Sequence, residues 1–284
     1  NIWYVSVSVN GKRTSRSLFT KNKQTAHKIK PSIELALLSE LTGSNHNKQN
    51  LAFGELTDLY LSTDHNWAQR TKELNEYVFS HYNSGKPLPT NPTSRAIFVR
   101  TINACWNWGL KNHLIDTAYK IPGDTKGESR MRTYTDEELK LMFAEITDAS
   151  FNAFVRFAYY TGARSGEIRR LSRENVLDKS LIVKGKTGRR MVKLNAQAQE
   201  IIKNQDQLWS YRKDFVSHKF KKEVRRLGIK NARFHDLRRT FGLNLIKQGM
   251  SIYKVSKLLG HSSVRTTEQH YAPLLTVEIE DFVL

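Results

Sequence analysis

Apolar residues recur at helical spacing along most of this chain, and only two stretches alternate in the way that β-strands do. The helical spacing runs through residues 53–115 with two breaks and returns in the apolar run Phe151–Tyr160. Residues 3–9 alternate as a half-buried strand does, and strand-like residues also occur at 12–19 and 180–194. The pattern therefore predicts a mainly α fold with small β elements, of the α+β class, and 284 residues allow two or three domains.

Residues 1–43 predict a small module made of one β-hairpin and one helix. The first strand alternates so that Trp3 and three valines would share a buried face, and Asn10-Gly11 is a strong two-residue turn signal. A helix should follow and end at Gly43. A β-ribbon fits a DNA major groove, so the basic second strand offers candidate DNA contacts. These are Lys12, Arg13 and Arg16, with a solvated charged strand as the equal alternative.

Residues 50–115 predict an all-helical domain, with helices over 53–63, 66–84 and 93–115, and residues 116–132 predict an interdomain linker. Trp106 and Trp108 are expected in the core of this domain rather than stacked on bases. Basic side chains of the helices and the linker either face phosphates or form a solvated surface. Those assigned to DNA are Arg95, Arg100, Lys120, Arg130 and Arg132.

A third domain is predicted over residues 133–284, including a C-terminal tail. Thr135 and Glu138 form a capping box that opens a helix. Residues 180–194 predict a β-hairpin with a basic tip, on which Arg189 is a further candidate DNA contact. Later helices are expected at about 195–204 and 214–227.

The chain carries a net charge of +19 and has an isoelectric point near 9.9. A charge of this size points to a polyanionic partner, with nucleic acid first and an anionic membrane surface second. The single cysteine, Cys105, excludes an internal disulfide framework and a cysteine-based metal cage, and its apolar neighbours predict that it is buried. The N-terminus looks like a strand rather than a signal peptide, and the reducing cytoplasm is the default location. The first residue is not an initiator Met, so residues upstream of it are expected.

Reactive side chains gather at the start of one predicted helix. His235 and Arg238 are three residues apart, so they share one face of the helix. That face lies beside an apolar stripe formed by Leu237, Phe241 and Leu245, which recur every four residues. Arg239 also lies close to His235 on this helix. Helix geometry alone does not choose between the two arginines.

Three more reactive side chains follow turns or helix ends. Arg164 follows the sharp turn predicted at Gly162, His261 follows the helix-ending Gly260, and Tyr271 lies on the next short helix. Side chains at helix ends can converge on a ligand without disturbing a core. The set is therefore a candidate site for cutting a phosphodiester.

Together these motifs resemble the tyrosine recombinases, the phage-integrase type of site-specific recombinase. The likeness covers essentially all of residues 133–271, and the matching motifs are Thr161-Gly162-Ala163-Arg164, Lys186-Thr187-Gly188, His235-Asp236-Leu237-Arg238, Leu258-Leu259-Gly260-His261 and Tyr271. The resemblance selects Arg238 over Arg239. It implies a mixed α/β catalytic domain, a helical core-binding domain over 50–115 and an arm-type DNA-binding module over 1–43.

The chemistry of the reaction gives these residues their expected roles. Arg164 and Arg238 can neutralise the charge that builds on the phosphate oxygens, with planar bidentate donors. The resemblance implies that Tyr271 attacks the phosphorus and forms a 3′-phosphotyrosyl link. A phenol has a pKa of about 10, so it needs a proton acceptor at neutral pH, and His235 is the candidate.

The remaining roles are implied by the resemblance. His261 would hydrogen-bond the phosphate, and Lys186 would protonate the departing 5′-oxygen. The covalent link conserves the energy of the phosphodiester, so neither ATP, metal nor any other cofactor is expected. Gly185-Lys186-Thr187 does not complete a phosphate-binding P-loop, because Ser180 stands where that motif requires glycine.

The resemblance also implies partners and a biological role. The partners are double-stranded DNA with core-type and arm-type sites, three further copies of the chain in a homo-tetramer, and an accessory DNA-bending or directionality factor. The enzyme would integrate or excise a mobile element in the nucleoid. Two alternatives stay open: a type IB topoisomerase with similar phosphotyrosyl chemistry, and a catalytically idle repressor or architectural protein. The intact catalytic set argues against the second, because DNA binding alone does not require it.

Overall fold

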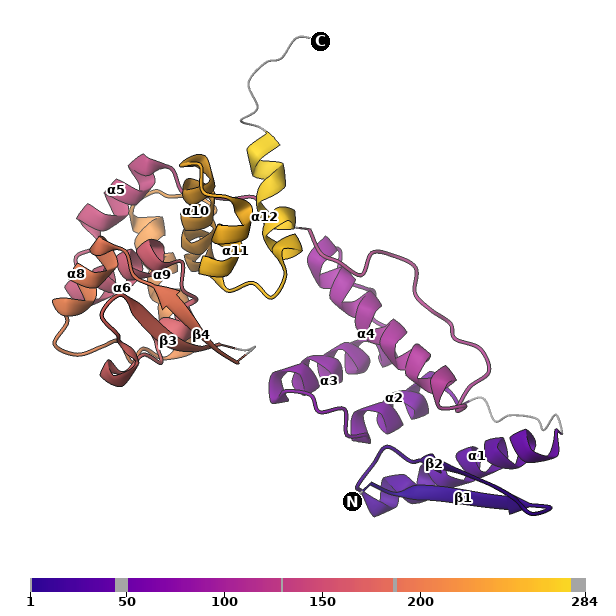
Figure 1. Ribbon diagram of the computed structural model, residues 1–284. Helices are drawn as coiled ribbons and strands as arrows, with labels where there is room; N and C mark the ends of the chain where they lie inside the picture. The colour runs from indigo at the N-terminus through magenta and orange to yellow at the C-terminus, as the bar shows by residue number, and fades with distance from the viewer. Residues whose placement is uncertain (1, 44–50, 129, 186–187, 277–284) are drawn as a thin grey trace, which may run out of the picture. The chain divides into compact units, whose positions relative to one another are not determined.

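The computed structural model describes residues 2–43, 51–128, 130–185 and 188–276, and the chain divides into two compact units, Asn1–Glu128 and Ser129–Leu284. The regular secondary structure of the described residues consists of twelve α-helices, one short 3-10 helix and two antiparallel two-stranded sheets (Figure 1). The predicted mainly α fold with small β elements is therefore confirmed. Within these ranges, no helix has both the length and the apolar character needed to cross a membrane.

The first unit begins with the predicted hairpin. Strands β1 (Tyr4–Val9) and β2 (Lys12–Ser17) pair antiparallel, and Asn10 and Gly11 between them have φ values of 48° and 76°, as a two-residue turn requires. Val5 and Val7 are buried, but the prediction for Trp3 was wrong, because this side chain is 44% exposed. It lies beyond the paired residues, and its indole N–H donates to the backbone oxygen of Lys21 at 3.2 Å.

Helix α1 (Lys23–Thr42) packs against the hairpin and continues through Pro31. It ends at Gly43, whose φ of 65° is the left-handed conformation that glycine adopts without strain. The helix end predicted at this glycine is confirmed.

Three further helices complete the first unit: α2 (Phe53–Ser62), α3 (Gln69–Asn83) and α4 (Pro92–Lys111). They confirm the three predicted helices, although α4 ends four residues early because Leu114 folds back to donate to the backbone oxygen of Gly109. Trp106 and Cys105 are buried as expected, and Trp108 packs partly buried against the same core. That core also contains residues of the hairpin and α1, so the boundary between the modules 1–43 and 50–115 stays a prediction.

The irregular segment after α4 lies along that helix. The Asn103 side chain bonds both backbone groups of Ile121, donating at 2.9 Å and accepting at 2.8 Å. Arg100 donates to the backbone oxygen of Thr125 at 3.0 Å. The first part of the predicted linker is thus held to the helical body by side chains of α4.

The second unit is built around a helix with a fully buried aromatic face. This helix is α6 (Ala149–Thr161), and its Phe151, Phe154 and Phe157 are all buried. The predicted capping box is confirmed, since Thr135 and Glu138 exchange side-chain bonds at the start of α5. The other elements up to the site are α5 (Asp136–Glu145), α7 (Ser165–Ile168), η1 (Arg173–Asn175), β3 (Ser180–Gly185), β4 (Gly188–Lys193), α8 (Ala196–Lys203) and α9 (Lys213–Arg226).

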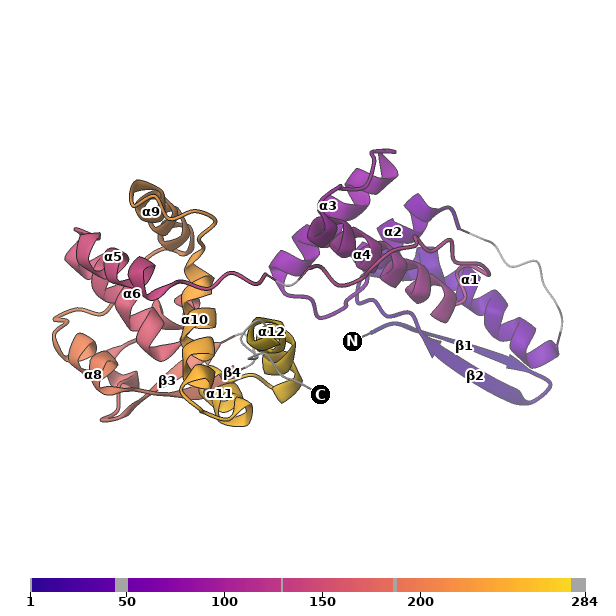
Figure 2. The same ribbon diagram turned by 90° about the horizontal axis from the view of Figure 1, so that it is seen from above.

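The last three helices are α10 (Phe234–Lys247), α11 (Ile252–Leu259) and α12 (Val264–Thr276). Helix α10 packs against α6 and α11, and α11 packs against α12, so the three lie side by side (Figure 2). The start of α10, the end of α11 and the first half of α12 come together with the turn after α6. That region holds the candidate site.

Candidate active site

Residues from the turn after α6 and from the last three helices line a pocket of about 170 Å³. The lining residues are Arg164, His235, Arg238, Arg239, His261, Thr266, His270 and Tyr271. The structure therefore brings together five of the six residues predicted for catalysis. The sixth, Lys186, lies outside the described residues.

The first turn of α10 presents His235 and Arg238 to this pocket. The Asp236 carboxylate accepts a bond from the backbone N–H of Arg233 at 2.9 Å and so closes the start of the helix. Leu237 is fully buried on the opposite side. Residues three apart then share the face that meets the pocket.

The guanidinium of Arg238 is held by two backbone oxygens. It donates to Gly162 and to Leu259, both at 2.6 Å, and only 4% of the residue is exposed. Burial, followed by the charge of Arg164, lowers the pKa of Arg238 to about 9, which still leaves it charged at neutral pH. A cation fixed in this way needs no rearrangement to meet an anion.

Glu167, on α7, fixes two more arginines. It is 1% exposed and accepts from Arg164 at 3.0 Å and from Arg190 at 3.1 and 2.7 Å. Burial alone would raise the pKa of Glu167, but the bonds and charges of Arg190 and Arg164 lower it to about 2. Arg164 stays 40% exposed on its side chain, so it reaches into the pocket while one edge is anchored.

Two glycines in the left-handed conformation lie just before Arg164 and His261, two of the candidate catalytic residues. Gly162 has a φ of 60°, and a Cβ there would lie 2.4 Å from the Phe241 ring. Gly260 has a φ of 64°, and a Cβ there would lie 2.4 Å from Cδ of Arg190. Both the backbone conformation and the packing therefore require glycine at these two turns.

The histidines of the pocket are held as neutral rings. His261 Nδ1 forms a 2.7 Å hydrogen bond with Oγ1 of the buried Thr267, which leaves Nε2 for a ligand. Burial, then the charges of Arg238 and Arg164, lowers the pKa of His261 to about 4. Among the described residues, no group of three His, Cys, Asp or Glu side chains is placed to hold a metal ion.

His235 keeps solvent access at the mouth of the pocket. Partial burial, followed by the charges of Arg238 and Arg239, lowers its pKa below the usual 6.5. A neutral imidazole at this place can accept a proton at neutral pH. His235 lines the same pocket as Tyr271, and its role as general base stays a prediction.

Tyr271 lies in the pocket of its own chain and is 2% exposed. Its ring packs with Leu243, Val255 and Leu259, and its hydroxyl approaches Gly242 so closely that a Cβ there would lie 2.2 Å from it. Burial raises the pKa of Tyr271 to about 12, although Arg238 and Arg239 act in the opposite direction. Glycine at position 242 is what makes room for the phenol.

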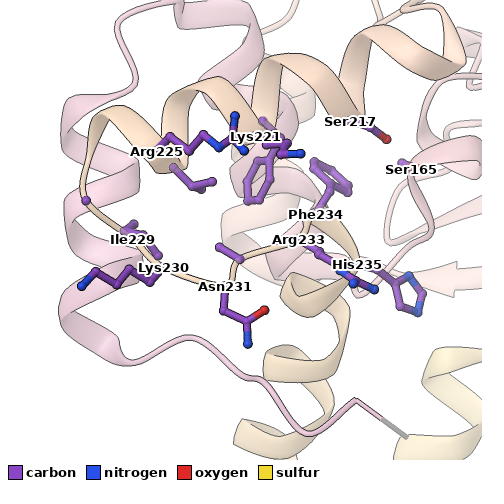
Figure 3. A pocket seen from close by; sticks show the side chains of 14 residues that line it. Ser165, Ser217, Lys221, Arg225, Ile229, Lys230, Asn231, Arg233, Phe234 and His235 are labelled. Carbon is purple, nitrogen blue, oxygen red and sulfur yellow. The ribbon is translucent and has the colours of Figure 1, made fainter. Parts of the chain in front are cut away.

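A larger groove of about 840 Å³ adjoins His235 between α9 and the segment that leads into α10 (Figure 3). Lys221 and Arg225 extend from α9, while Lys230 and Arg233 come from the segment. Within the described part of the chain, four cations and no carboxylate line it. It is therefore a groove with four basic side chains, and it reaches the site at His235.

The residues predicted to contact DNA have different environments, and their roles stay predictions. Those that lie exposed are Lys12, Arg13, Arg95, Arg100, Lys120 and Arg189. Arg16 is paired with Glu40 at 2.6 Å, and Arg132 with Glu138 over the ring of Tyr134. Arg130 is paired with Asp236 at 2.9 Å.

Sequence reasoning did not assign several residues that the structure places at the site. Thr266, His270 and Arg239 line the pocket, and Arg190 joins Glu167 behind it. The sequence could have indicated Arg239, because residues four apart on a helix are neighbours and Arg239 is four residues from His235. No sequence pattern could have indicated Arg190, since Glu167 and the backbone oxygen of Leu258, which it contacts, are distant from it in sequence.

Comparison with known proteins gives a family match and a curated relative. The model of the phage integrase family matches residues 132–276, just over half of the chain. A tyrosine recombinase XerC-like protein of Caldanaerobacter subterraneus subsp. tengcongensis is 23% identical, over 72% of this chain and 67% of that protein.

Two solved structures share the fold at low sequence identity. A lambda integrase dimer bound to a COC′ core site has a TM-score of 0.67 at 18% identity, covering 99% of this chain and 95% of that one. The Tn1549 transposon integrase in complex with a circular intermediate DNA has a TM-score of 0.63 at 13% identity, covering 81% of this chain and all of that one.

Replacement of Gly242 by alanine should displace Tyr271. The added Cβ meets the hydroxyl, so we expect a loss of about 1–3 kcal/mol in the free energy of unfolding of the second unit. Chemical denaturation measures this loss. The control is Gly54→Ala on α2, where the added Cβ has open space and should not destabilise. Equal stability of Gly242→Ala and the parent protein would contradict the packing described for Tyr271.

The lowered pKa of His261 should be visible in the DNA-free protein. Its ring should titrate near pH 4 rather than 6.5 in an NMR titration, with the signal assigned from a His261→Gln variant. Because protonation is disfavoured in the folded state, His261 should lower stability as the pH falls from about 6.5 towards 4. His261→Gln should lessen that fall, and an ordinary midpoint near 6.5 would show that the ring is solvated.

Proposed function

The chain belongs to the phage integrase family, and from this we propose that Tyr271 is the nucleophile with which it cuts DNA. The protein is a tyrosine-type site-specific recombinase, an enzyme that cleaves and rejoins DNA through a phosphotyrosine intermediate. The observation that supports the residue assignment is the shared pocket, in which a phenol, histidines and arginines from separate helices meet.

The proposed cleavage forms one bond and breaks one. Oη of Tyr271 attacks the phosphorus, the new O–P bond makes a 3′-phosphotyrosyl link, and the bond from phosphorus to the 5′-oxygen breaks. His235 takes the phenol proton, and its lowered pKa keeps the ring neutral before the reaction. Lys186, the predicted acid, gives a proton to the departing 5′-oxygen. Reversal by a 5′-hydroxyl of another strand rejoins the DNA.

Arg238 and Arg164 bind the non-bridging oxygens of the phosphate in this proposal. The backbone oxygens of Gly162 and Leu259 hold Arg238, and Glu167 holds Arg164, so the positive charge is in place before the reaction starts. His261 donates from Nε2, because Thr267 occupies the other ring nitrogen. Each group therefore has a fixed direction towards the same small volume.

Double-stranded DNA is the proposed partner, and the basic groove beside His235 is its proposed path. Four cations line the groove (Figure 3), and His235 lines both the groove and the pocket that holds Tyr271. The net charge of +19 supports the same partner. The DNA backbone would then enter the site along α9.

Assembly and biological role are proposed by analogy with the solved relatives. Lambda integrase has been solved as a tetramer bound to a Holliday junction and the Tn1549 protein as a transposon integrase. We propose that four copies of this chain form a tetramer that brings two DNA duplexes together. The duplexes would carry core-type and arm-type sites, and an accessory factor that bends the DNA or sets the direction of the reaction would assist. The proposed task is integration or excision of a mobile element, carried out at the nucleoid.

Replacement of Tyr271 by phenylalanine should abolish covalent attachment to DNA while DNA binding changes less than about threefold. The target sequence is first obtained by expressing the protein in cells, denaturing the lysate and sequencing the DNA that stays attached. A duplex of that sequence, nicked beside the scissile phosphate, then traps the adduct on a denaturing gel. An adduct formed by Tyr271→Phe would refute the assignment. Relaxation of supercoiled DNA without site preference would instead favour a topoisomerase.

The basic groove should contribute to the salt dependence of DNA binding. Each phosphate contact adds about 0.9 to the slope of log affinity against log salt. The double variant Lys221→Gln/Arg225→Gln should therefore lower the slope by about two, as measured by fluorescence anisotropy between about 50 and 200 mM salt. The control is Lys140→Gln/Lys203→Gln, which removes equal charge from exposed positions on α5 and α8. Equal slopes for the two variants would exclude the groove as the DNA path.

A further inference from the structure

Arg239 has a buried donor that nothing in the described residues satisfies. Its side chain is only 10% exposed and lines the pocket with Arg238 and Tyr271. Within the described ranges, its Nη1 atom has no hydrogen-bond partner. Buried polar groups are nearly always bonded, so an unsatisfied guanidinium nitrogen in a pocket indicates an acceptor that comes from outside the chain.

The nearest carboxylate does not serve as that acceptor. Oδ1 of Asp236 lies 3.6 Å from Nη1 of Arg239, which allows attraction between the charges but is too long for a hydrogen bond. Arg239 is therefore attracted towards Asp236 without being bonded to it. A small movement of either side chain would change this.

Arg130 already uses the oxygens of Asp236. Its Nε donates to Oδ1 and its Nη2 to Oδ2, both at 2.9 Å, while the backbone N–H of Arg233 also bonds Oδ2. Asn231 holds the other side of the same guanidinium through Oδ1 at 2.8 Å. Arg130 thus takes the place that Arg239 would otherwise occupy on the carboxylate.

We propose that Arg239 is a third phosphate-binding arginine of the active site, and that Arg130 keeps it available by occupying Asp236. The inference rests on the proposed function, because the phosphate is the one that Tyr271 would attack. Arg239 is then a catalytic residue that touches the substrate. Arg130 and Asp236 are positioning residues that act through it.

The charges of the pocket support this assignment. Burial, opposed in part by Asp236, lowers the pKa of Arg239, so its charged form lacks a full set of partners in the DNA-free protein. A phosphodiester under attack gains a second negative charge on its non-bridging oxygens. Arg164 and Arg238 already have carboxylate or carbonyl partners on one edge, whereas Nη1 of Arg239 has none among the described residues.

Arg130 comes from a part of the chain far in sequence from the helix to which it is bonded. It lies just after Glu128, where the first unit ends, and it is bonded to the first turn of the helix that carries His235. Asp236 and Arg130 are 106 residues apart in sequence. The first described residue of the second unit therefore helps to keep Arg239 available, within that unit.

A substrate with one charge removed tests whether Arg239 binds the scissile phosphate. The nicked duplex described above is prepared as the ordinary phosphodiester, as a methylphosphonate at the scissile position, and as a methylphosphonate at the next phosphate. On the ordinary duplex, Arg239→Gln should form adduct about 100-fold more slowly than the parent protein. On the duplex with scissile methylphosphonate, this deficit should shrink to less than about tenfold, because the charge that Arg239 would neutralise is gone.

The control is Arg156→Gln, an equal loss of charge at an exposed position of α6, which should leave all three rates unchanged. Arg130→Gln should also slow adduct formation, because Asp236 would then bond Arg239. The double variant Arg130→Gln/Asp236→Asn should be faster than Arg130→Gln alone, since the amide attracts Arg239 less strongly and can still accept from the N–H of Arg233. No gain in the double variant would overturn the role of Arg130.

The outcomes separate this inference from the proposed function. Failure of the parent protein to form any adduct would remove the proposed function itself. If the parent reacts and Arg239→Gln reacts equally fast, or is slowed equally on the phosphodiester and the scissile methylphosphonate, Arg239 does not bind that phosphate. A deficit that shrinks only with the neighbouring methylphosphonate would assign Arg239 to the next phosphate and overturn the proposal as stated.

Discussion

Two buried carboxylates determine the geometry of this site before any DNA arrives. Glu167 and Asp236 are each 1% exposed. Glu167 bonds Arg164 and Arg190, while Asp236 bonds Arg130 and attracts Arg239 from 3.6 Å without a hydrogen bond. Buried charges persist only when they are paired and hydrogen-bonded. The carboxylates supply negative charge next to these guanidinium groups. Of the four arginines, Arg164 and Arg239 line the pocket in which we propose that the phosphate binds.

The site depends on short helices and on glycines at their ends. Left-handed turns at Gly162 and Gly260 send the chain back towards α10, and the backbone oxygen of Gly162 is itself a partner of Arg238. Gly242 leaves space on α10 for the ring of Tyr271. Backbone conformation, rather than a large cavity, therefore brings the reactive groups together. A rigid scaffold of this kind suits catalysis that relies on preorganised charge.

Much of the fold and most of the site follow from local sequence pattern. Helix period, turn signals and the capping box at Thr135 act within a few residues, and the motifs place His235 and Arg238 three residues apart on one face. The contacts of Arg130 and Arg190 span distant parts of the chain, so no local pattern reveals them. The burial predicted for Trp3 was wrong for the same reason. How far α1 covers the first strand depends on tertiary packing, and Trp3 stays exposed.

Burial of Tyr271, the proposed nucleophile, has a consequence for the protection of chromosomal DNA. A phenol with a pKa of about 12 is ionised in roughly one molecule in 10⁵ at pH 7. Free protein therefore carries almost no phenolate that could attack the many phosphate esters of a genome. Reactivity then has to be supplied together with the substrate, whose negative charge engages Arg238 and its neighbours. A recombinase that cleaved DNA at a wrong site would break a chromosome. A tyrosine that stays protonated until the correct DNA is bound prevents such cleavage.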